Sequence, residues 1–217
     1  MNPHAIGPFG GTFDPMHLAH LRMARAFIEQ AGLSQLRVIP AGSPYHRQQP
    51  TQATAAQRLE MVRLALAGQP AMVVDDREIQ RDGPSFTMDT LEEVRAEVGT
   101  EVPLWLLIGA DSLKRLDTWK RWTELFDLAH LAVAMRPGFS EDNLSSSVRQ
   151  QWMARQSSRL PIQSASGTIL RLVLPPLDLS ASAIRDSISK NIDISHLVPP
   201  AIASYICEQG LYRLSKG

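Results

Sequence analysis

The sequence predicts an α/β fold in which helices flank a parallel sheet, and three observations support this prediction. Apolar residues recur at helical spacing from about 15 to 31, between an expected strand at His4 to Phe9 and the apolar strand Gln35 to Pro40. Such a strand, helix and strand unit makes its two strands parallel through a right-handed crossover. The run Pro103 to Ile108 is almost wholly apolar, as a central parallel strand buried on both faces should be.

The remaining elements follow from the same criteria. We expect one domain over 1–217, in which the C-terminal part, at about 178–217, is small and helical. Pro199 and Pro200 start its last helix and Gly210 stops it. The other expected strands lie at 71–75, 128–136 and 168–174, and the other expected helices lie at 53–67, 88–98 and 148–156.

The composition is that of an ordinary globular protein. Of 217 residues, 44% are hydrophobic and 20% are charged, with 22 basic residues against 22 acidic ones. This balance predicts no attraction to nucleic acid polymers. The single cysteine, Cys207, excludes an internal disulfide framework, and we expect it to be a small buried residue. The sequence shows neither a signal peptide nor a membrane-spanning run, so the expected location is the cytoplasm, with no membrane partner.

The residues from 10 to 16 predict a loop that handles phosphate and leads into a helix. Gly10 and Gly11 allow a ligand to approach the backbone closely. Asp14 and Pro15 predict the N-cap and the first position of a helix that begins near residue 16. The unpaired N–H groups and the positive dipole end of such a helix favour an anion.

His17 and His20 share one face of that expected first turn, because they are three residues apart. A phosphate at the helix start would meet both imidazoles. A metal site fits less well, since helical zinc pairs are usually spaced i, i+4 and no third ligand is in view. For the pair taken alone, two ordinary surface histidines are the alternative.

A second helix start that suits an anion is expected at 179–185. Ser180 and Ser182 supply hydroxyls, and Arg185 shares a face with Ser182, so hydroxyl, backbone and guanidinium donors come together. This set of donors suits the oxygens of a triphosphate. A capped helix with an exposed arginine is the alternative.

Other candidates follow the strand ends, where open parallel sheets bind ligands. His46 and Arg47 lie in the loop after the strand at 35–40, and Arg136 ends a later strand, so all three are candidates for phosphate contact. Gly109 allows close approach of a ligand, and Asp111 either accepts from a ribose hydroxyl or an amine or caps the following helix. Solvated loop charges are the alternative for the three basic residues.

Two motifs and two middle segments carry a resemblance to a known family. Gly10 to His20 resembles the GGTFDPxHxxH signature of the nucleotidyltransferase superfamily, and Leu179 to Arg185 resembles its Ile-Ser-Ser-Thr-x-Ile-Arg motif. Through Pro84 to Thr90 and Trp119 to Trp122, the chain further resembles the bacterial nicotinate-mononucleotide adenylyltransferases. The resemblance implies a Rossmann-like parallel sheet flanked by helices, with a small helical C-terminal part.

The resemblance also implies a reaction and its residues. The phosphate of nicotinate mononucleotide would attack the α-phosphate of ATP in line, with Mg²⁺ bound to ATP, to give nicotinate adenine dinucleotide and pyrophosphate. The implied catalytic residues are His17, His20 and Arg185, and no residue is expected to bind a metal. The implied ATP site comprises Gly10, Gly11, Thr12, Phe13, His17, His20, Gly109, Asp111, Ser180, Ser182 and Arg185, and the implied acceptor site comprises His46, Arg47, Pro84, Ser85, Phe86, Thr87, Trp119 and Arg136.

Within the implied acceptor site, the segment at 84–87 would lie beside the nicotinate carboxylate. Backbone N–H groups at a helix start suit a carboxylate, and a simple helix cap is the alternative for Ser85 and Thr87. Trp119 is implied to stack on the pyridine ring, whereas we expect Trp122 to pack in the core.

Two other functions remain open at this stage. One is the same chemistry on another acceptor, such as phosphopantetheine, and the other is a non-catalytic module that binds nucleotide. The sequence leaves open the preference for nicotinate over nicotinamide mononucleotide. It also leaves open whether the chain forms a homo-oligomer.

Overall fold

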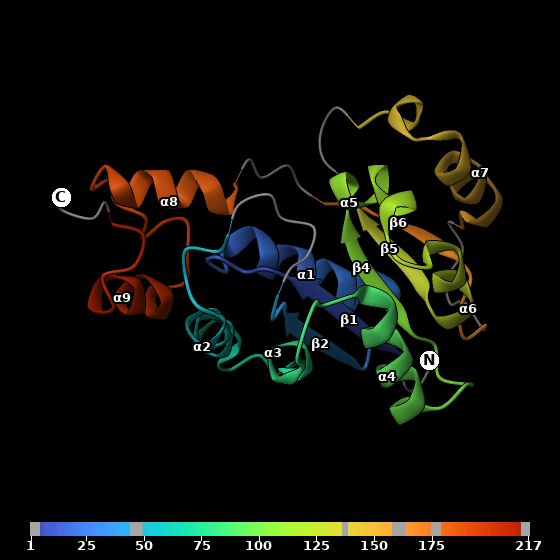
Figure 1. Cartoon of the computed structure of the whole chain (residues 1–217), viewed down its shortest axis with the longest axis horizontal. Coiled ribbons are helices and arrows are strands. Elements are labelled where there is room, and N and C mark those ends of the chain that lie inside the picture. The colour runs from blue at the N-terminus through green and yellow to red at the C-terminus, as the bar shows by residue number, and fades with distance from the viewer. Residues whose placement is uncertain (1–4, 44–49, 136–138, 158–163, 175–178, 214–217) are drawn as a thin grey trace.

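The computed structural model describes residues 5–43, 50–135, 139–157, 164–174 and 179–213. Its strands and helices alternate along the chain (Figure 1). The strands are β1 (Ile6–Gly11), β2 (Gln35–Pro40), β3 (Met72–Val74), β4 (Trp105–Gly109), β5 (His130–Ala134) and β6 (Ile169–Leu172). The helices are α1 (Leu18–Ala31), α2 (Ala55–Leu66), α3 (Arg77–Gln80), α4 (Thr87–Val98), α5 (Ala110–Lys114), α6 (Leu125–Leu128), α7 (Ser146–Arg155), α8 (Ala181–Ser189) and α9 (Pro200–Glu208), with 3-10 turns η1 (Leu116–Thr118), η2 (Trp122–Glu124) and η3 (Glu141–Asn143).

The strands pair in parallel in two sets of three. One set has the order β1-β2-β3 and the other the order β4-β5-β6. They adjoin at a parallel bridge between Ile6 and Leu104, where the Ile6 N–H donates to the Pro103 carbonyl at 3.0 Å. The combined order, β3-β2-β1-β4-β5-β6, reverses direction between β1 and β4. In open α/β sheets, ligands bind beyond the carboxyl ends of the strands at such a reversal point.

Pro8 accounts for the opening of the sheet between β1 and β4. The backbone of Ile6 faces β4, and residue 8, two positions on, faces the same side. Proline has no N–H to donate, so it cannot continue a ladder of hydrogen bonds toward β4. The carboxyl halves of the two strands therefore lie apart and leave room for a cavity.

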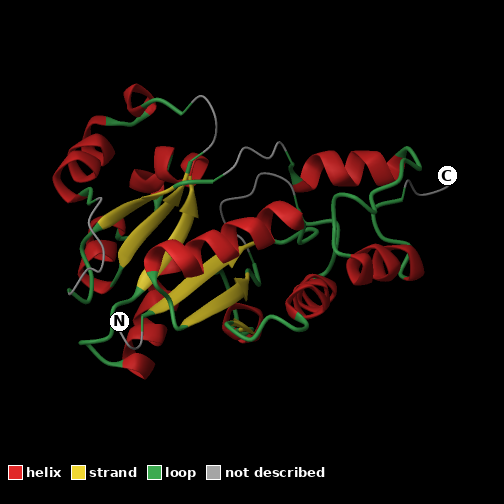
Figure 2. Cartoon of the chain, turned by 180° about the vertical axis from the view of Figure 1, so that it is seen from behind, coloured by secondary structure: helices red, strands yellow, loops and turns green. Residues whose placement is uncertain are grey.

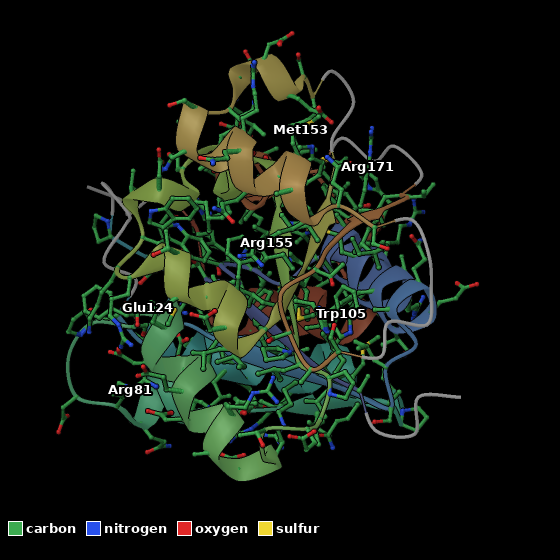
Figure 3. The ribbon with its side chains drawn as sticks, turned by 90° about the vertical axis from the view of Figure 1, so that its right-hand side faces the viewer. Arg81, Trp105, Glu124, Met153, Arg155 and Arg171 are labelled. Atoms are coloured by element: carbon green, nitrogen blue, oxygen red, sulfur yellow. The ribbon has the colours of Figure 1, made fainter. Side chains whose placement is uncertain are left out.

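Helices cover both faces of the sheet. Alternate residues of β4 face opposite sides, so Leu107 joins the core under α1, whereas Leu106 and Ile108 join the core under α4. Figure 2 shows α1 crossing the strands, and Figure 1 shows α4 on the opposite face. The expected burial of the central strand on both faces is confirmed. Figure 3 places Trp105 of β4 inside the ribbon and Met153 of α7 at its edge.

The C-terminal helices α8 and α9 lie at one end of the molecule, beyond α2 (Figures 1 and 2). The Leu18 N–H at the start of α1 donates to the Leu197 carbonyl at 3.0 Å, which ties this part to the first helix. Helix α9 begins with Pro200 at its first position, as the sequence predicts. None of the helices that the structure describes combines the length and apolar character needed to cross a bilayer.

The fold class predicted from the sequence is confirmed, and most element boundaries shift by only a few residues. Cys207 corrects one expectation, because it is exposed rather than buried. Helix α9 directs Ile202 and Ile206 into the core, and Cys207, one residue after Ile206, points away from it. The start of α1 is a second correction and is described with the site below.

His130 is a fully buried titratable residue at the start of β5. Its Nδ1 accepts from the Thr168 N–H at 3.0 Å, so the ring proton of the neutral form sits on Nε2, which donates to the Ser164 carbonyl at 2.8 Å. The ring also lies against Trp105, with the two ring centres 4.4 Å apart. Burial lowers the pKa of His130, because a charged imidazolium is poorly solvated there.

We therefore expect acid to destabilise the protein partly through His130. The unfolded chain binds a proton at this residue below about pH 6.5, whereas the folded chain resists it to lower pH, so stability falls as pH falls through that range. The slope from this group is at most about 1.4 kcal/mol per pH unit. His130→Gln, which keeps a donor for Ser164 but does not titrate, should flatten the pH dependence of the unfolding free energy measured in urea.

The matched control is His196→Gln, because His196 is exposed. This variant should keep the pH slope of the unmodified protein. If His130→Gln left the pH dependence of the unfolding free energy unchanged, His130 would not be a source of the acid sensitivity.

Candidate active site

A cavity of about 280 Å³ lies where β1 and β4 part, between the carboxyl ends of the two strands. Backbone and side chains of both strands line it, together with the loops and helices that follow them. The lining residues named by the sequence analysis are Gly10, Gly11, Thr12, Ser85, Thr87, Gly109, Asp111 and Trp119, and further lining residues are Pro8, Phe9, Ile39, Ala41, Glu78, Thr90, Leu91, Leu106, Leu107, Ile108, Ser112 and Arg115.

The loop after β1 differs from the prediction at its helix start. Asp14 and Pro15 are neither the N-cap nor the first helical residue, because α1 begins at Leu18 with His17 as its N-cap. The Asp14–Pro15 peptide bond is cis. Phe13 is buried below the loop, and a Cβ on Gly11 would lie only 2.7 Å from its ring. Glycine at position 11 thus makes room for Phe13, whereas Gly10 borders open space.

Asp14 turns inward instead, and its carboxylate accepts hydrogen bonds from other segments. The backbone N–H groups of Gln52 and Ala53, before α2, donate to it at 3.0 and 3.2 Å. The Tyr212 hydroxyl, near the C-terminus, donates at 2.8 Å. Asp14 is 2% exposed, so these donors replace the water that a buried carboxylate loses. They are the physical reason why Asp14 does not cap its own helix.

His17 and His20 lie together at the start of α1, as their spacing predicts. Their rings stack with centres 3.7 Å apart, and the His20 ring also meets the edge of Phe13 at 5.1 Å. The His17 backbone N–H donates to His20 Nδ1 at 3.2 Å, so neutral His20 carries its proton on Nε2. Burial, and then the nearby His17, lower the pKa of His20 and keep it neutral. His20 thus offers an uncharged N–H donor next to Phe9, which lines the cavity.

The second motif forms the start of α8 and reaches the first one. Ser180 is the N-cap, and its hydroxyl accepts from the Ala183 N–H at 3.2 Å. Arg185 donates through Nη2 to the Ser182 hydroxyl at 3.2 Å, as their shared face predicts. It also donates through Nη1 to the Asp14 carbonyl at 2.7 Å, across 171 residues of sequence. Its buried Nε has no hydrogen-bond partner among the described residues.

Only some residues of the segments at 84–90 and 119–122 line the cavity. Ser85, Thr87 and Trp119 line it, whereas Pro84 is exposed and Phe86 lies under the Lys120 ammonium, 4.6 Å from its ring centre. Neither Ser85 nor Thr87 caps α4, because the N-cap is Phe86 and it makes no side-chain cap.

Trp122 is half-buried and packs against the core under α4, so its expected packing role is confirmed at the edge of the core. Gly109 is the N-cap of α5, so Asp111 is not the cap that one alternative predicted. Asp111 lies instead in the first turn of α5 and borders the cavity. His46, Arg47 and Arg136 lie outside the described residues.

Sequence reasoning missed two buried charged residues next to the cavity. Glu78, in α3, is 8% exposed and lines the cavity, and burial raises the pKa of its carboxyl group although hydrogen bonds from Thr90 and Ser85 oppose that shift. Arg58, in α2, is 1% exposed and donates to the carbonyls of Thr12 at 2.8 Å and Gly42 at 3.1 Å. Both lie in charged amphipathic stretches, where the sequence pattern alone favours a solvated position.

A family model and two relatives each match most of this chain. The family model described as cytidylyltransferase-like matches residues 8–187. A probable nicotinate-nucleotide adenylyltransferase of Chromobacterium violaceum is 54% identical over 208 residues, which cover 96% of this chain and 98% of the relative. A protein of the same description from Laribacter hongkongensis is 48% identical over 210 residues, covering 96% of this chain and 94% of the relative.

A solved structure shows the same fold at low sequence identity. It is the Plasmodium falciparum nicotinic acid mononucleotide adenylyltransferase complexed with NaAD, with a TM-score of 0.73 at 18% identity. The superposition covers 96% of this chain and 97% of that one.

The Asp14 contacts generate a prediction about stability. Tyr212→Phe removes the hydroxyl that donates to Asp14 and leaves a buried carboxylate one donor short, so the unfolding free energy should fall by about 1 to 3 kcal/mol. Urea unfolding would measure this loss. Tyr205→Phe is the control, because the half-buried Tyr205 hydroxyl makes no hydrogen bond within the described part of the chain. Equal losses in the two variants would contradict a specific role for the Asp14 contact.

Proposed function

Because this chain belongs to the cytidylyltransferase-like family and, within it, to the nicotinate-nucleotide adenylyltransferases, we propose that it joins ATP to nicotinate mononucleotide. The products are nicotinate adenine dinucleotide and pyrophosphate, and the reaction belongs to NAD biosynthesis. The mononucleotide phosphate attacks the α-phosphorus of ATP, and pyrophosphate leaves from the opposite side. The attacking oxygen is already anionic, so the protein needs no nucleophile of its own.

The observation that carries this function is the meeting of the two helix starts. Arg185 of α8 donates to the Asp14 carbonyl at 2.7 Å, and Asp14 lies three residues before His17, the N-cap of α1. Gly10, Gly11 and Thr12 of the first motif line the cavity at the carboxyl ends of β1 and β4, and the Arg185 bond joins the second motif to the same loop. Such a gathering of N–H and guanidinium donors suits a polyphosphate chain.

The roles that we propose follow from charge. The attacking and leaving groups are both anionic, so catalysis consists mainly of holding them in line and offsetting the charge between them. We assign His20 Nε2–H, with His17 and Thr12, to the reacting phosphates. Ser182 and Arg185 are assigned to the departing phosphates, and the buried Nε of Arg185 is a donor still available for them.

The acceptor side of the cavity is assigned to the mononucleotide. Trp119 is half-buried in the cavity wall, with its ring available for stacking on a pyridine. Ser85 and Thr87 border the same space at the start of α4, where backbone N–H groups suit the nicotinate carboxylate. Gly109 and Asp111, on the β4 side, are assigned to adenosine.

We propose that Mg²⁺ enters with ATP, since this ion keeps several waters and takes most of its other ligands from phosphate oxygens. That route suits the donor set, because the described segments gather no three His, Cys, Asp or Glu side chains into a metal site. The bound ion would offset the negative charge of the phosphates.

The function is tested by pyrophosphate release across a panel of acceptors with ATP and Mg²⁺. We expect release with nicotinate mononucleotide. Release with phosphopantetheine alone would assign another acceptor, and binding of ATP without release with any acceptor would make the chain a nucleotide-binding module. Nicotinamide mononucleotide in the same panel measures the preference for the acid.

His20→Ala should lower kcat by about 10² to 10³, by analogy with the loss of one donor to a developing oxyanion. The KM for ATP should change far less, because the donor matters most as charge develops at the α-phosphate. Steady-state kinetics measure both constants. His196→Ala, at an exposed histidine, is the control and should keep the kcat of the unmodified enzyme. An unchanged kcat in His20→Ala would remove His20 from the reacting centre.

Trp119→Ala should chiefly raise the KM for nicotinate mononucleotide, by about 10-fold, because stacking of an aromatic side chain on a base contributes about 1 to 3 kcal/mol. Trp122→Ala is the matched control, since Trp122 is also half-buried but does not line the cavity. A selective rise in the KM for ATP would place Trp119 at the other substrate.

A further inference from the structure

We propose that Glu78 is a positioning residue for the mononucleotide side of the cavity. In this proposal, which rests on the proposed function, its carboxylate is the shared acceptor that holds Ser85 and Thr90. Through Ser85 it also fixes the loop at Gly42 and Ser43. The three segments then form one wall in the shape that the nicotinate group requires.

The location of Glu78 is the first step of the argument. Glu78 is 8% exposed, and it lines the cavity together with Ser85, Thr87 and Thr90. A buried carboxyl group is costly unless hydrogen bonds replace its water. Glu78 therefore needs its donors, and the donors belong to the segment assigned to the acceptor.

The first set of hydrogen bonds runs in one direction, toward Glu78. Arg81 Nη1 donates to the Thr90 hydroxyl oxygen at 3.2 Å, and the Thr90 hydroxyl donates to Glu78 Oε1 at 2.7 Å. A guanidinium only donates, so the Thr90 proton is directed to the carboxylate. Arg81 is itself held by Glu93 at 2.7 Å, on the outer side of α4.

The second set has the same direction and joins two loops. The backbone N–H groups of Gly42 and Ser43 donate to the Ser85 hydroxyl oxygen at 3.2 and 3.3 Å. These two bonds use the lone pairs of the Ser85 oxygen, so its single proton is left for another acceptor. Glu78 lines the cavity together with Ser85, and we assign that proton to its carboxylate. The lowering effect of Ser85 on the pKa of Glu78 agrees with this assignment. In this arrangement Glu78 is the terminal acceptor of both sets.

The backbone of the loop after β2 also packs tightly against the backbone of α3. A Cβ on residue 42 would lie only 2.0 Å from the Glu78 carbonyl oxygen, so glycine is required for this approach. Arg58 donates to the Gly42 carbonyl at 3.1 Å, and the Ser85 N–H donates to the Ser43 carbonyl at 3.1 Å. With so little free space around the loop, the Ser85 and Thr90 hydroxyls depend on Glu78 for their orientation.

Glu78→Gln tests the proposal, because an amide keeps the shape but replaces one acceptor oxygen with a donor. A hydroxyl that faces the amide nitrogen must then turn away from residue 78. Binding is measured by tryptophan fluorescence, with nicotinate mononucleotide and with ATP titrated separately, and steady-state kinetics give KM and kcat. We expect Kd and KM for the mononucleotide to rise about 10-fold or more, a change equivalent to one lost hydrogen bond. The KM for ATP should stay close to that of the unmodified enzyme.

Two further variants keep the test decisive if Glu78→Gln folds poorly. Thr90→Val removes one donor with little change in volume and should weaken mononucleotide binding in the same selective way. Ser85→Ala should do so too, and its effect should not add fully to that of Glu78→Gln, since both act through one contact. Glu92→Gln is the control, because among the described residues the Glu92 side chain forms only an exposed ion pair, with Arg121 at 2.7 Å.

The outcomes separate this inference from the proposed function. Equal losses for both substrates, or unchanged mononucleotide binding, in Glu78→Gln and Thr90→Val would overturn the role of Glu78. If the unmodified protein binds the mononucleotide but releases no pyrophosphate, the function fails while the binding comparison still decides the inference. If the unmodified protein does not bind the mononucleotide, both fail.

Discussion

The arrangement of the site depends on a carboxylate that is buried rather than presented to a ligand. Asp14 accepts from Gln52, Ala53 and Tyr212, and its carbonyl accepts from Arg185. One residue of the loop after β1 therefore binds the entrance to α2, the C-terminal segment and the start of α8. Removing its partners leaves an uncompensated charge in the interior, which is far costlier than losing a surface contact. The donors that we assign to ATP are held in place by this residue.

Two features of the structure produce the cavity in which we propose that the substrates meet. Pro8 withholds a hydrogen bond between β1 and β4, and the strands part at the reversal point of the sheet. Buried polar groups then shape the walls, because Arg58 holds the loops at Thr12 and Gly42 on the β1 side. The site thus combines an apolar opening in a sheet with hydrogen bonds that have little freedom to rearrange. Such preorganisation suits a reaction in which the protein supplies position and charge rather than a nucleophile.

The sequence predicted the fold well because its apolar periodicity reports burial directly. The all-apolar strand β4 and the amphipathic helix α1 are local signals, and both elements formed. The predicted start of α1 was wrong because Asp-Pro is a strong local helix signal, whereas the donors that turn Asp14 inward lie 38 to 198 residues away. Spacing correctly placed Arg185 beside Ser182. Glu78 and Arg58 were missed because burial of a charge depends on the tertiary packing around it, such as the carbonyls of Thr12 and Gly42 that accept from Arg58, and the apolar periodicity of the sequence does not report this packing.

The hydrogen bond between Tyr212 and Asp14 also has a consequence for the synthesis of the protein on the ribosome. The two residues are 198 positions apart, so at about 5 to 20 residues per second a ribosome needs about 10 to 40 s to pass from one to the other. During that interval the nascent loop has a carboxylate without its tyrosine partner. The loop after β1 can reach its final form only when almost all of the described chain has been synthesised, so a ribosome that stalls early releases a product that lacks this closing contact.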